Sequence, residues 1–226
     1  MLNYKKPTFW IVVIAIILLV VVAIGLSTNP INTEKPPNPG DIKATSLSEE
    51  ELAYFNGDSF FNGDYMNVRN QFLSSPYDEP SDINLFELFY CGSGLDETMT
   101  DDELMAVMEK LEMTDNPDCK CEKNSTANMD EILTEHMNIK LADTKKMGLE
   151  DFVYLSDYDA YYFFHGDTNY RSNINFSRGE REGDVIRLFY IDGFFADGEK
   201  ILTLREKNGE YLFTSNQIID EAMVAD

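Results

Sequence analysis

The residues best suited to chemistry follow a short aromatic run, where an imidazole, a carboxylate, a phenol and a guanidinium lie close together. They are His165, Asp167, Tyr170 and Arg171. A histidine near an aspartate can transfer protons as an acid–base pair, and all of these groups can bind a polar ligand. Gly166-Asp167 is, however, first of all turn chemistry. The pattern makes these residues candidates for a ligand-binding site, and an acid–base role for His165 and Asp167 is the less favoured alternative.

Metal and thiol chemistry have little support elsewhere in the chain. The other histidine, His136, lies on a helical stripe of apolar residues, where a half-buried or surface histidine is commoner than a metal ligand. The cysteines are Cys91, Cys119 and Cys121; Cys-x-Cys is neither the Cys-x-x-Cys redox spacing nor a complete zinc site. We interpret them as incidental thiols or as one loop staple from Cys91. We predict no metal, no cofactor and no enzymatic activity.

A short repeat, Phe-Asn-Gly-Asp, occurs at 55–58 and again at 61–64. Asn-Gly-Asp is a turn sequence, so tandem turns are the preferred interpretation, and a calcium loop is the alternative. The acidic pairs of the chain do not fit the D-x-[DN]-x-[DN]-G pattern that a calcium loop requires.

The charge of the chain excludes one class of partner. It has 41 acidic and 18 basic residues, a net charge of −23 at pH 7. Nucleic-acid binding depends on clustered lysine and arginine, and such an acidic surface repels phosphates. We therefore predict no nucleic-acid partner. The 43% of hydrophobic residues are sufficient for one folded core.

An apolar segment near the N-terminus predicts a membrane anchor. Between Thr8 and Leu26 the chain has no charged residue, and a helix of that length just crosses a hydrocarbon core of about 30 Å. Lys5 and Lys6 precede the segment, which places the N-terminus in the cytoplasm and the rest of the chain outside. The alternative is a cleaved signal peptide, although this apolar run is longer than usual for one. We predict a single-pass protein of the cell membrane with an extracellular C-terminal domain.

The chain then divides into four parts: a cytoplasmic tip at 1–7, a transmembrane helix at 8–27, a proline-rich stalk at 28–44 and an extracytoplasmic domain at 45–226. The stalk assignment follows from its prolines, which fix φ and remove backbone donors.

The first half of the extracytoplasmic domain reads as helical. Ser48 and Thr100 each have a glutamate three residues later, which is the capping-box pattern at a helix start. Asn128, also followed by a glutamate, predicts a third helix start.

The second half reads as strands, and Asn208-Gly209 predicts a type I′ hairpin between the last two. The class is α+β: a helical half packed on an antiparallel meander sheet of four or five strands. The runs rich in aromatic or branched residues are 159–165, 172–177, 184–191, 200–207 and 210–215.

Two stretches resemble known proteins. The sequence from Leu2 to Trp10, with the apolar helix and the following Thr28-Asn29-Pro30, resembles the last transmembrane helix of BlaR-type membrane metallopeptidases, which are sensors in Gram-positive bacteria. The chain lacks the His-Glu-x-x-His and Ser-x-x-Lys motifs of that family, so protease and penicillin-binding activity are not implied. The exterior domain resembles uncharacterised exported domains of gut Firmicutes in its opening LSEEELAYFN (47–56) and in the segment YFFHGDTNY (162–170). This resemblance implies a location and no activity.

Together these observations predict a membrane-anchored domain that binds or senses an extracellular ligand or protein. A structural or protein-interaction domain at the cell wall is the alternative, and a hydrolase using His165 and Asp167 is the third.

Overall fold

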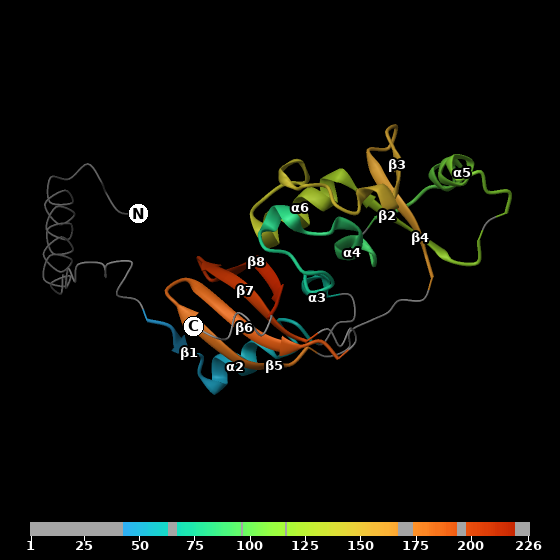
Figure 1. Ribbon diagram of the computed structural model, residues 1–226. Helices are drawn as coiled ribbons and strands as arrows, with labels where there is room; N and C mark the ends of the chain where they lie inside the picture. The colour runs from blue at the N-terminus through green and yellow to red at the C-terminus, as the bar shows by residue number, and fades with distance from the viewer. Residues whose placement is uncertain are drawn as a thin grey trace, which may run out of the picture. The chain divides into compact units, whose positions relative to one another are not determined.

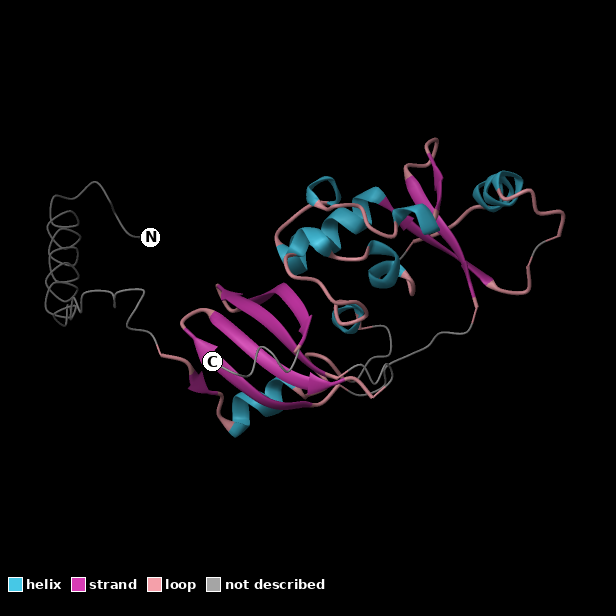
Figure 2. Ribbon diagram, viewed as in Figure 1, coloured by secondary structure: helices cyan, strands magenta, loops and turns pink. Residues whose placement is uncertain are grey.

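The main sheet of the computed structural model has five strands, and all but one of them are consecutive in the C-terminal part of the chain. Figures 1 and 2 show this sheet. The consecutive strands are β5 (Phe176–Glu182), β6 (Val185–Ile191), β7 (Glu199–Lys207) and β8 (Glu210–Ile218), each antiparallel to the next. The short strand β1 (Thr45–Ser46) pairs with β5, which gives the order β1-β5-β6-β7-β8. The α+β class and the antiparallel sheet are therefore confirmed.

The predicted cytoplasmic tip, transmembrane helix and most of the stalk lie outside the described part of the chain. Within that part, no helix combines the length and the apolar character needed to cross a membrane. The described residues belong to one compact unit, Lys43–Asp226. The structure describes residues 43–62, 67–95, 97–115, 117–166, 174–193 and 198–219.

The hairpin between β7 and β8 has the predicted turn. Asn208 and Gly209 have φ values of 56° and 84°, and a type I′ turn requires positive φ at both central positions. Because this turn twists in the same sense as the strands, it fixes the register in which Lys207 lies opposite Glu210.

A second, three-stranded sheet was not predicted. It consists of β2 (Lys120–Ser125), β3 (Val153–Leu155) and β4 (Ala160–His165), in the antiparallel order β2-β4-β3. The prediction that 159–165 belongs to the meander is therefore wrong. One of the two partners of β4 is β2, the polar segment Lys-Cys-Glu-Lys-Asn-Ser, whose composition does not indicate a strand.

The first long strand of the meander is also displaced from its predicted position. The run 172–177 predicted a strand, but β5 begins at Phe176 and continues through charged residues to Glu182. Its inward positions are small or apolar: a Cβ on Gly179 would lie 2.5 Å from Leu47 Cδ1. Leu47 packs over the strand because Gly179 has no side chain, so the hydrophobic pattern of β5 is interrupted where the packing is tightest.

The helix starts at Ser48 and Thr100 are confirmed, since both residues form complete capping boxes. The start at Asn128 is wrong: the cap is Ser125, whose hydroxyl accepts a hydrogen bond of 3.2 Å from the Asn128 N–H. The helices described are α2 (Glu49–Phe55), α3 (Val68–Gln71), α4 (Leu85–Phe89), α5 (Asp101–Lys110) and α6 (Thr126–Met137), with 3-10 turns η1 (Pro80–Asp82), η2 (Leu141–Asp143) and η3 (Leu149–Asp151).

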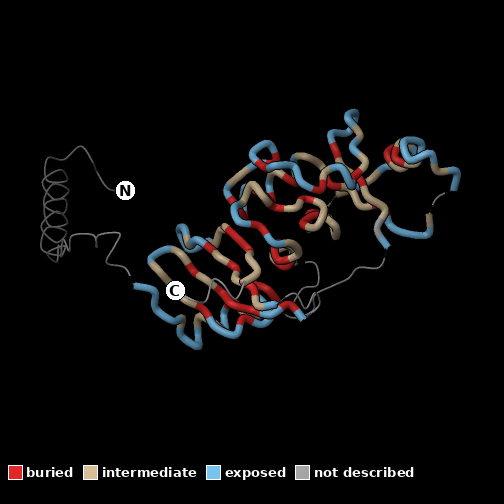
Figure 3. The backbone as a smooth tube through the Cα atoms, in the orientation of Figure 1, coloured by how far each residue is buried: buried red, intermediate tan, exposed pale blue. Residues whose placement is uncertain are grey.

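The core lies between the main sheet and the helices that contact it, α6 at β8 and α2 at β5. Buried residues alternate along β7, where Leu202 and Leu204 are buried, and Phe213 of β8 is buried as well. Figure 3 shows buried stretches in red along the strands of the sheet. A smaller apolar cluster lies between α5 and the three-stranded sheet, around Val107 and Tyr162. The expected packing of helices on a sheet thus occurs at two sheets instead of one.

The repeated Phe-Asn-Gly-Asp segments have a tertiary role besides their turns. The side-chain amide of Asn56 donates to the Phe176 carbonyl (3.1 Å) and accepts from the Phe176 N–H (2.7 Å). Asn62 makes the same two bonds to Ile174. The repeat therefore joins the end of α2 to the chain at the start of β5; Gly63 and Asp64 lie outside the described residues.

Candidate functional site

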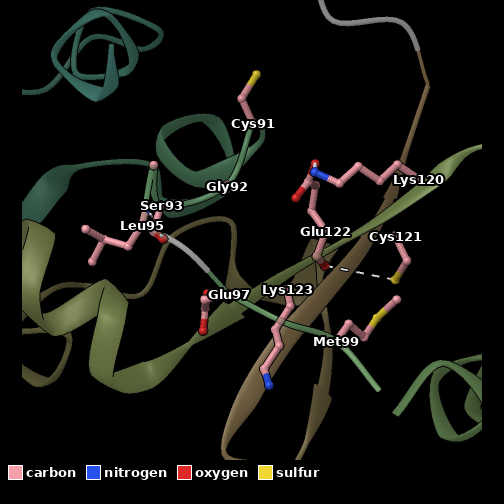
Figure 4. Close-up of a pocket in the computed structure, with 11 residues that line it drawn as sticks. Cys91, Gly92, Ser93, Leu95, Glu97, Met99, Lys120, Cys121, Glu122 and Lys123 are labelled. Carbon is pink, nitrogen blue, oxygen red and sulfur yellow. Dashed lines mark hydrogen bonds and ion pairs between the residues drawn. The ribbon is translucent and has the colours of Figure 1, made fainter. Parts of the chain in front are cut away.

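A pocket of about 380 Å³ lies between β2 and the loop after α4 (Figure 4). This volume is within the range of small-molecule sites, roughly 300–1,000 Å³. The lining residues are Cys91, Gly92, Ser93, Gly94, Leu95, Glu97, Met99, Lys120, Cys121, Glu122 and Lys123.

The loop wall of the pocket is shaped by local backbone chemistry. Gly92 and Gly94 have φ values of 85° and 76°, a conformation that glycine adopts without steric cost. Between them Ser93 is buried, and its hydroxyl accepts a hydrogen bond of 3.2 Å from the Leu95 N–H. The Gly92 N–H donates to the carbonyl of Phe89, the last residue of α4 (2.9 Å). The loop is therefore held against α4 and faces β2.

The charged groups of the pocket are engaged with protein partners. Lys120 Nζ lies 2.6 Å from Glu122 Oε1, and Lys123 Nζ lies 2.6 Å from Glu103 Oε1. The Glu97 carboxylate accepts from the Ser125 N–H at 3.0 and 3.1 Å. A ligand with a large net charge would have to disrupt these pairs, which is costly where they are partly buried. The pocket is therefore suited to a polar ligand of low net charge.

The two thiols in the pocket are poor nucleophiles. Burial, with the negative charge of Glu122, raises the pKa of Cys91 and of Cys121, the latter to about 11. Because the thiolate is the reactive and metal-binding form, both groups are inert near neutral pH. Cys91, Cys119 and Cys121 are all free, and Figure 4 shows the Cys91 sulfur pointing away from Cys121. The structure thus has incidental thiols and no loop staple from Cys91.

A buried carboxylate lies behind the pocket. Only 2% of Glu103 is exposed, and its Oε1 accepts a hydrogen bond of 2.6 Å from the Tyr162 hydroxyl as well as the Lys123 contact. Burial acts to raise the pKa of Glu103, but the bonds from Lys123, Tyr162 and Thr100 outweigh it and hold this pKa at about 2. Glu103 was recognised in the sequence only as part of a capping box. Its role in joining α5 to β2 and β4 depends on residues distant in the chain.

The predicted ligand residues are only partly located. His165 is the last residue of β4, and its backbone lies opposite Lys120, which lines the pocket. Asp167, Tyr170 and Arg171 lie outside the described residues, so their convergence with His165 stays a prediction.

A smaller cavity of about 150 Å³ lies where α2, α3, α6 and the β7–β8 hairpin meet. The sequence did not indicate it, because its residues come from separate parts of the chain. They are Tyr54, Phe60, Arg69, Glu135, His136, Gly209, Glu210 and Tyr211.

His136 lies at the wall of this cavity and is more buried than predicted. It is 5% exposed, and its ring packs edge-on against Phe72, with ring centroids 5.3 Å apart. Burial, followed by the positive charge of Arg69, lowers the pKa of His136 to about 4. The imidazole is therefore neutral at pH 7 and belongs to the core.

Within the described ranges, no group of three histidine, cysteine or acidic side chains is arranged to hold a metal ion. Comparison with protein-family models, with curated proteins and with solved structures finds no match to this chain.

Proposed function

We propose that this chain is a membrane-tethered extracytoplasmic module that binds a small polar molecule and acts as a binding or sensing protein. The observation that carries the proposal is the pocket between β2 and the loop after α4, which has the volume of a small-molecule site. The uncharged run from Thr8 to Leu26 provides the tether.

The chemistry of the pocket favours binding over turnover. Its lysines are paired with Glu122 and Glu103, and its thiols are protonated near neutral pH. Groups in these states can donate hydrogen bonds to a ligand or accept them from it, but they do not supply an activated nucleophile or base. An acid–base hydrolase using His165 and Asp167 is the less favoured alternative.

A protein-interaction role at the cell wall is a second candidate, and exposed aromatic residues near the β3–β4 turn favour it. Tyr154 and Tyr158 are 36% and 39% exposed, and the rings of Tyr154 and Tyr161 have centroids 4.7 Å apart. Exposed tyrosines are typical of contact surfaces, because they combine an apolar ring with a polar hydroxyl.

The binding proposal is tested by screening small polar molecules for thermal stabilisation of the full-length protein in detergent. Leu95→Trp places a bulky ring in the pocket, and Met105→Trp places the same ring on α5, where Met105 is 60% exposed. We expect a hit to stabilise the wild type and the Met105→Trp variant but not the Leu95→Trp variant. A screen without hits, or hits that stabilise both variants equally, would overturn the assignment of this pocket.

The membrane tether is tested separately by protease treatment of intact cells that carry an epitope tag at the C-terminus. We expect the tag to be lost from outside while the mature N-terminus still begins near Met1. A mature N-terminus near Thr28 would instead indicate a secreted protein.

A further inference from the structure

Arg69 differs from the other arginines that the structure describes. Each of those has a carboxylate within ion-pair distance: Glu199 for Arg178, Glu51 and Glu206 for Arg181, Glu182 for Arg187, and Asp184 for Arg205. Arg69 has no such partner among the described residues. Because acidic residues greatly outnumber basic ones in this chain, whose net charge is −23, an arginine without an ion-pair partner is unexpected.

The surroundings of Arg69 hold its guanidinium in place without using its hydrogen-bond donors. Arg69 lies in α3 and is half-buried, and its Cζ lies 5.1 Å from the centroid of the Phe60 ring. A guanidinium over a ring face is positioned by a cation–π contact, which leaves its N–H groups directed elsewhere. No described residue forms a hydrogen bond with the Arg69 side chain. The Arg69 guanidinium is therefore held over the Phe60 ring, and its N–H groups can donate hydrogen bonds to a ligand.

The cavity next to Arg69 also presents aromatic faces and negative charge. Phe60 and Tyr211 form one edge-to-face pair with centroids 5.4 Å apart, and Tyr54 lies 6.0 Å from Tyr211. Glu135 and Glu210 line the same cavity, and neither lies within ion-pair distance of Arg69. One small cavity therefore contains an available cation, aromatic rings and two carboxylates.

We propose that this cavity binds a small zwitterion, namely a free α-amino acid with a short side chain. The ligand carboxylate would accept two parallel hydrogen bonds from the Arg69 guanidinium. The ammonium group of the ligand would lie toward Glu135, Glu210 and the aromatic rings. A cavity of about 150 Å³ corresponds to roughly five water volumes, which restricts the ligand to a few heavy atoms.

The charge of the protein favours a zwitterion over the two simpler ligands. A plain anion is repelled by the acidic surface and by the two carboxylates of the cavity. A plain cation would be repelled by the guanidinium of Arg69 and would offer no acceptor to its N–H groups. A zwitterion carries no net charge and satisfies both kinds of group. The proposal stands without the pocket beside β2, because the two cavities share no residue.

Calorimetric titration of the full-length protein in detergent with glycine, L-alanine and L-serine tests the proposal. Acetate and methylammonium, each one half of the zwitterion, serve as comparison ligands. We expect at least one amino acid to bind, and each half to bind at least about tenfold more weakly. Failure of all three amino acids to bind, or acetate binding as tightly as the best of them, would overturn the proposal. Neither result would affect the pocket beside β2.

Variants locate the site. Arg69→Gln should weaken amino-acid binding by about thirtyfold or more. Arg69→Lys keeps the positive charge but cannot form the bidentate pair, so it should weaken binding by about tenfold. Arg205→Gln is the matched control, because Arg205 is half-exposed and paired with Asp184. Equal binding by the Arg69 and Arg205 variants would place the ligand elsewhere. Arg69→Lys keeps the test meaningful if Arg69→Gln does not fold.

His136 provides a readout that a purely structural Arg69 would not produce. A carboxylate bound to Arg69 neutralises the charge that helps to keep this imidazole unprotonated. The Glu135 carboxylate lies 3.8 Å from His136 Nε2, but its side chain is 58% exposed and screened by solvent, so the charge of the half-buried Arg69 dominates. We expect the pKa of His136, followed by NMR, to rise on addition of the bound amino acid and to stay constant in Arg69→Gln. An unchanged pKa despite binding would contradict ligation at Arg69.

Discussion

Asn62 holds the backbone of Ile174 through both ends of its side-chain amide. Its Nδ2 donates to the Ile174 carbonyl at 3.0 Å, and its Oδ1 accepts from the Ile174 N–H at 2.8 Å. The same Nδ2 also donates to the Asn56 carbonyl at 2.7 Å. A buried amide thus replaces the strand neighbour that Ile174 would otherwise need.

Asn62→Asp should destabilise the protein by about 2 kcal/mol, because a carboxylate cannot donate to either carbonyl and is itself buried. Chemical denaturation of the full-length protein measures the change. Asn175→Asp makes the same charge change at an exposed neighbouring position and should have little effect. Equal effects would show that the amide bonds contribute nothing to stability.

Glu103→Gln should destabilise the protein by about 3 kcal/mol, since it leaves Lys123 without its buried partner. Glu109→Gln, on the exposed side of α5, is the control. The folded pKa of Glu103, about 2, lies below its ordinary 4.5. The stabilisation is therefore complete above pH 4.5 and is lost as the pH falls toward 2. A wild-type pH profile that matches the variant in this window would contradict the assignment.

His136 should control stability in a higher pH window. Its folded pKa of about 4 lies below the ordinary 6.5, so the unfolded state takes up the proton first. Stability is complete above pH 6.5 and should fall by roughly 3 kcal/mol as the pH drops toward 4. His136→Phe keeps an aromatic ring against Phe72 and removes the titration. Denaturation midpoints of this variant between pH 7 and 4.5 should change less than those of the wild type.

Gly148 and Gly209 both have positive φ, and comparing their alanine variants separates backbone strain from crowding. A Cβ at Gly209 meets nothing within 4 Å, so Gly209→Ala should cost only the strain, about 1 kcal/mol. A Cβ at Gly148 would contact Asn84 Oδ1, the N-cap of α4, and lie 2.8 Å from the Phe86 backbone nitrogen. Gly148→Ala should therefore cost about 3 kcal/mol or more. Thermal unfolding compares the two, and equal losses would refute the crowding argument.

The sequence by itself determined the features that depend on neighbouring residues. Ser48 and Thr100 bind backbone groups three residues away, and Asn208-Gly209 adopts its turn because of its own φ preferences. The α+β class follows from the same local patterns, since helix and strand periodicities are visible in the chain.

Only the tertiary structure decided which distant segments meet. β4 pairs with the polar segment β2 because burial against α5, and not strand composition, stabilises that pairing. The sequence of the repeat predicts only turns, whereas the hydrogen bonds of Asn56 to Phe176 and of Asn62 to Ile174 are visible only in the structure. Likewise, Glu103 acquires its low pKa from Lys123 and Tyr162, and the cavity at Arg69 draws its wall from four elements. These contacts form between groups far apart in the chain, so local residue preferences cannot specify them.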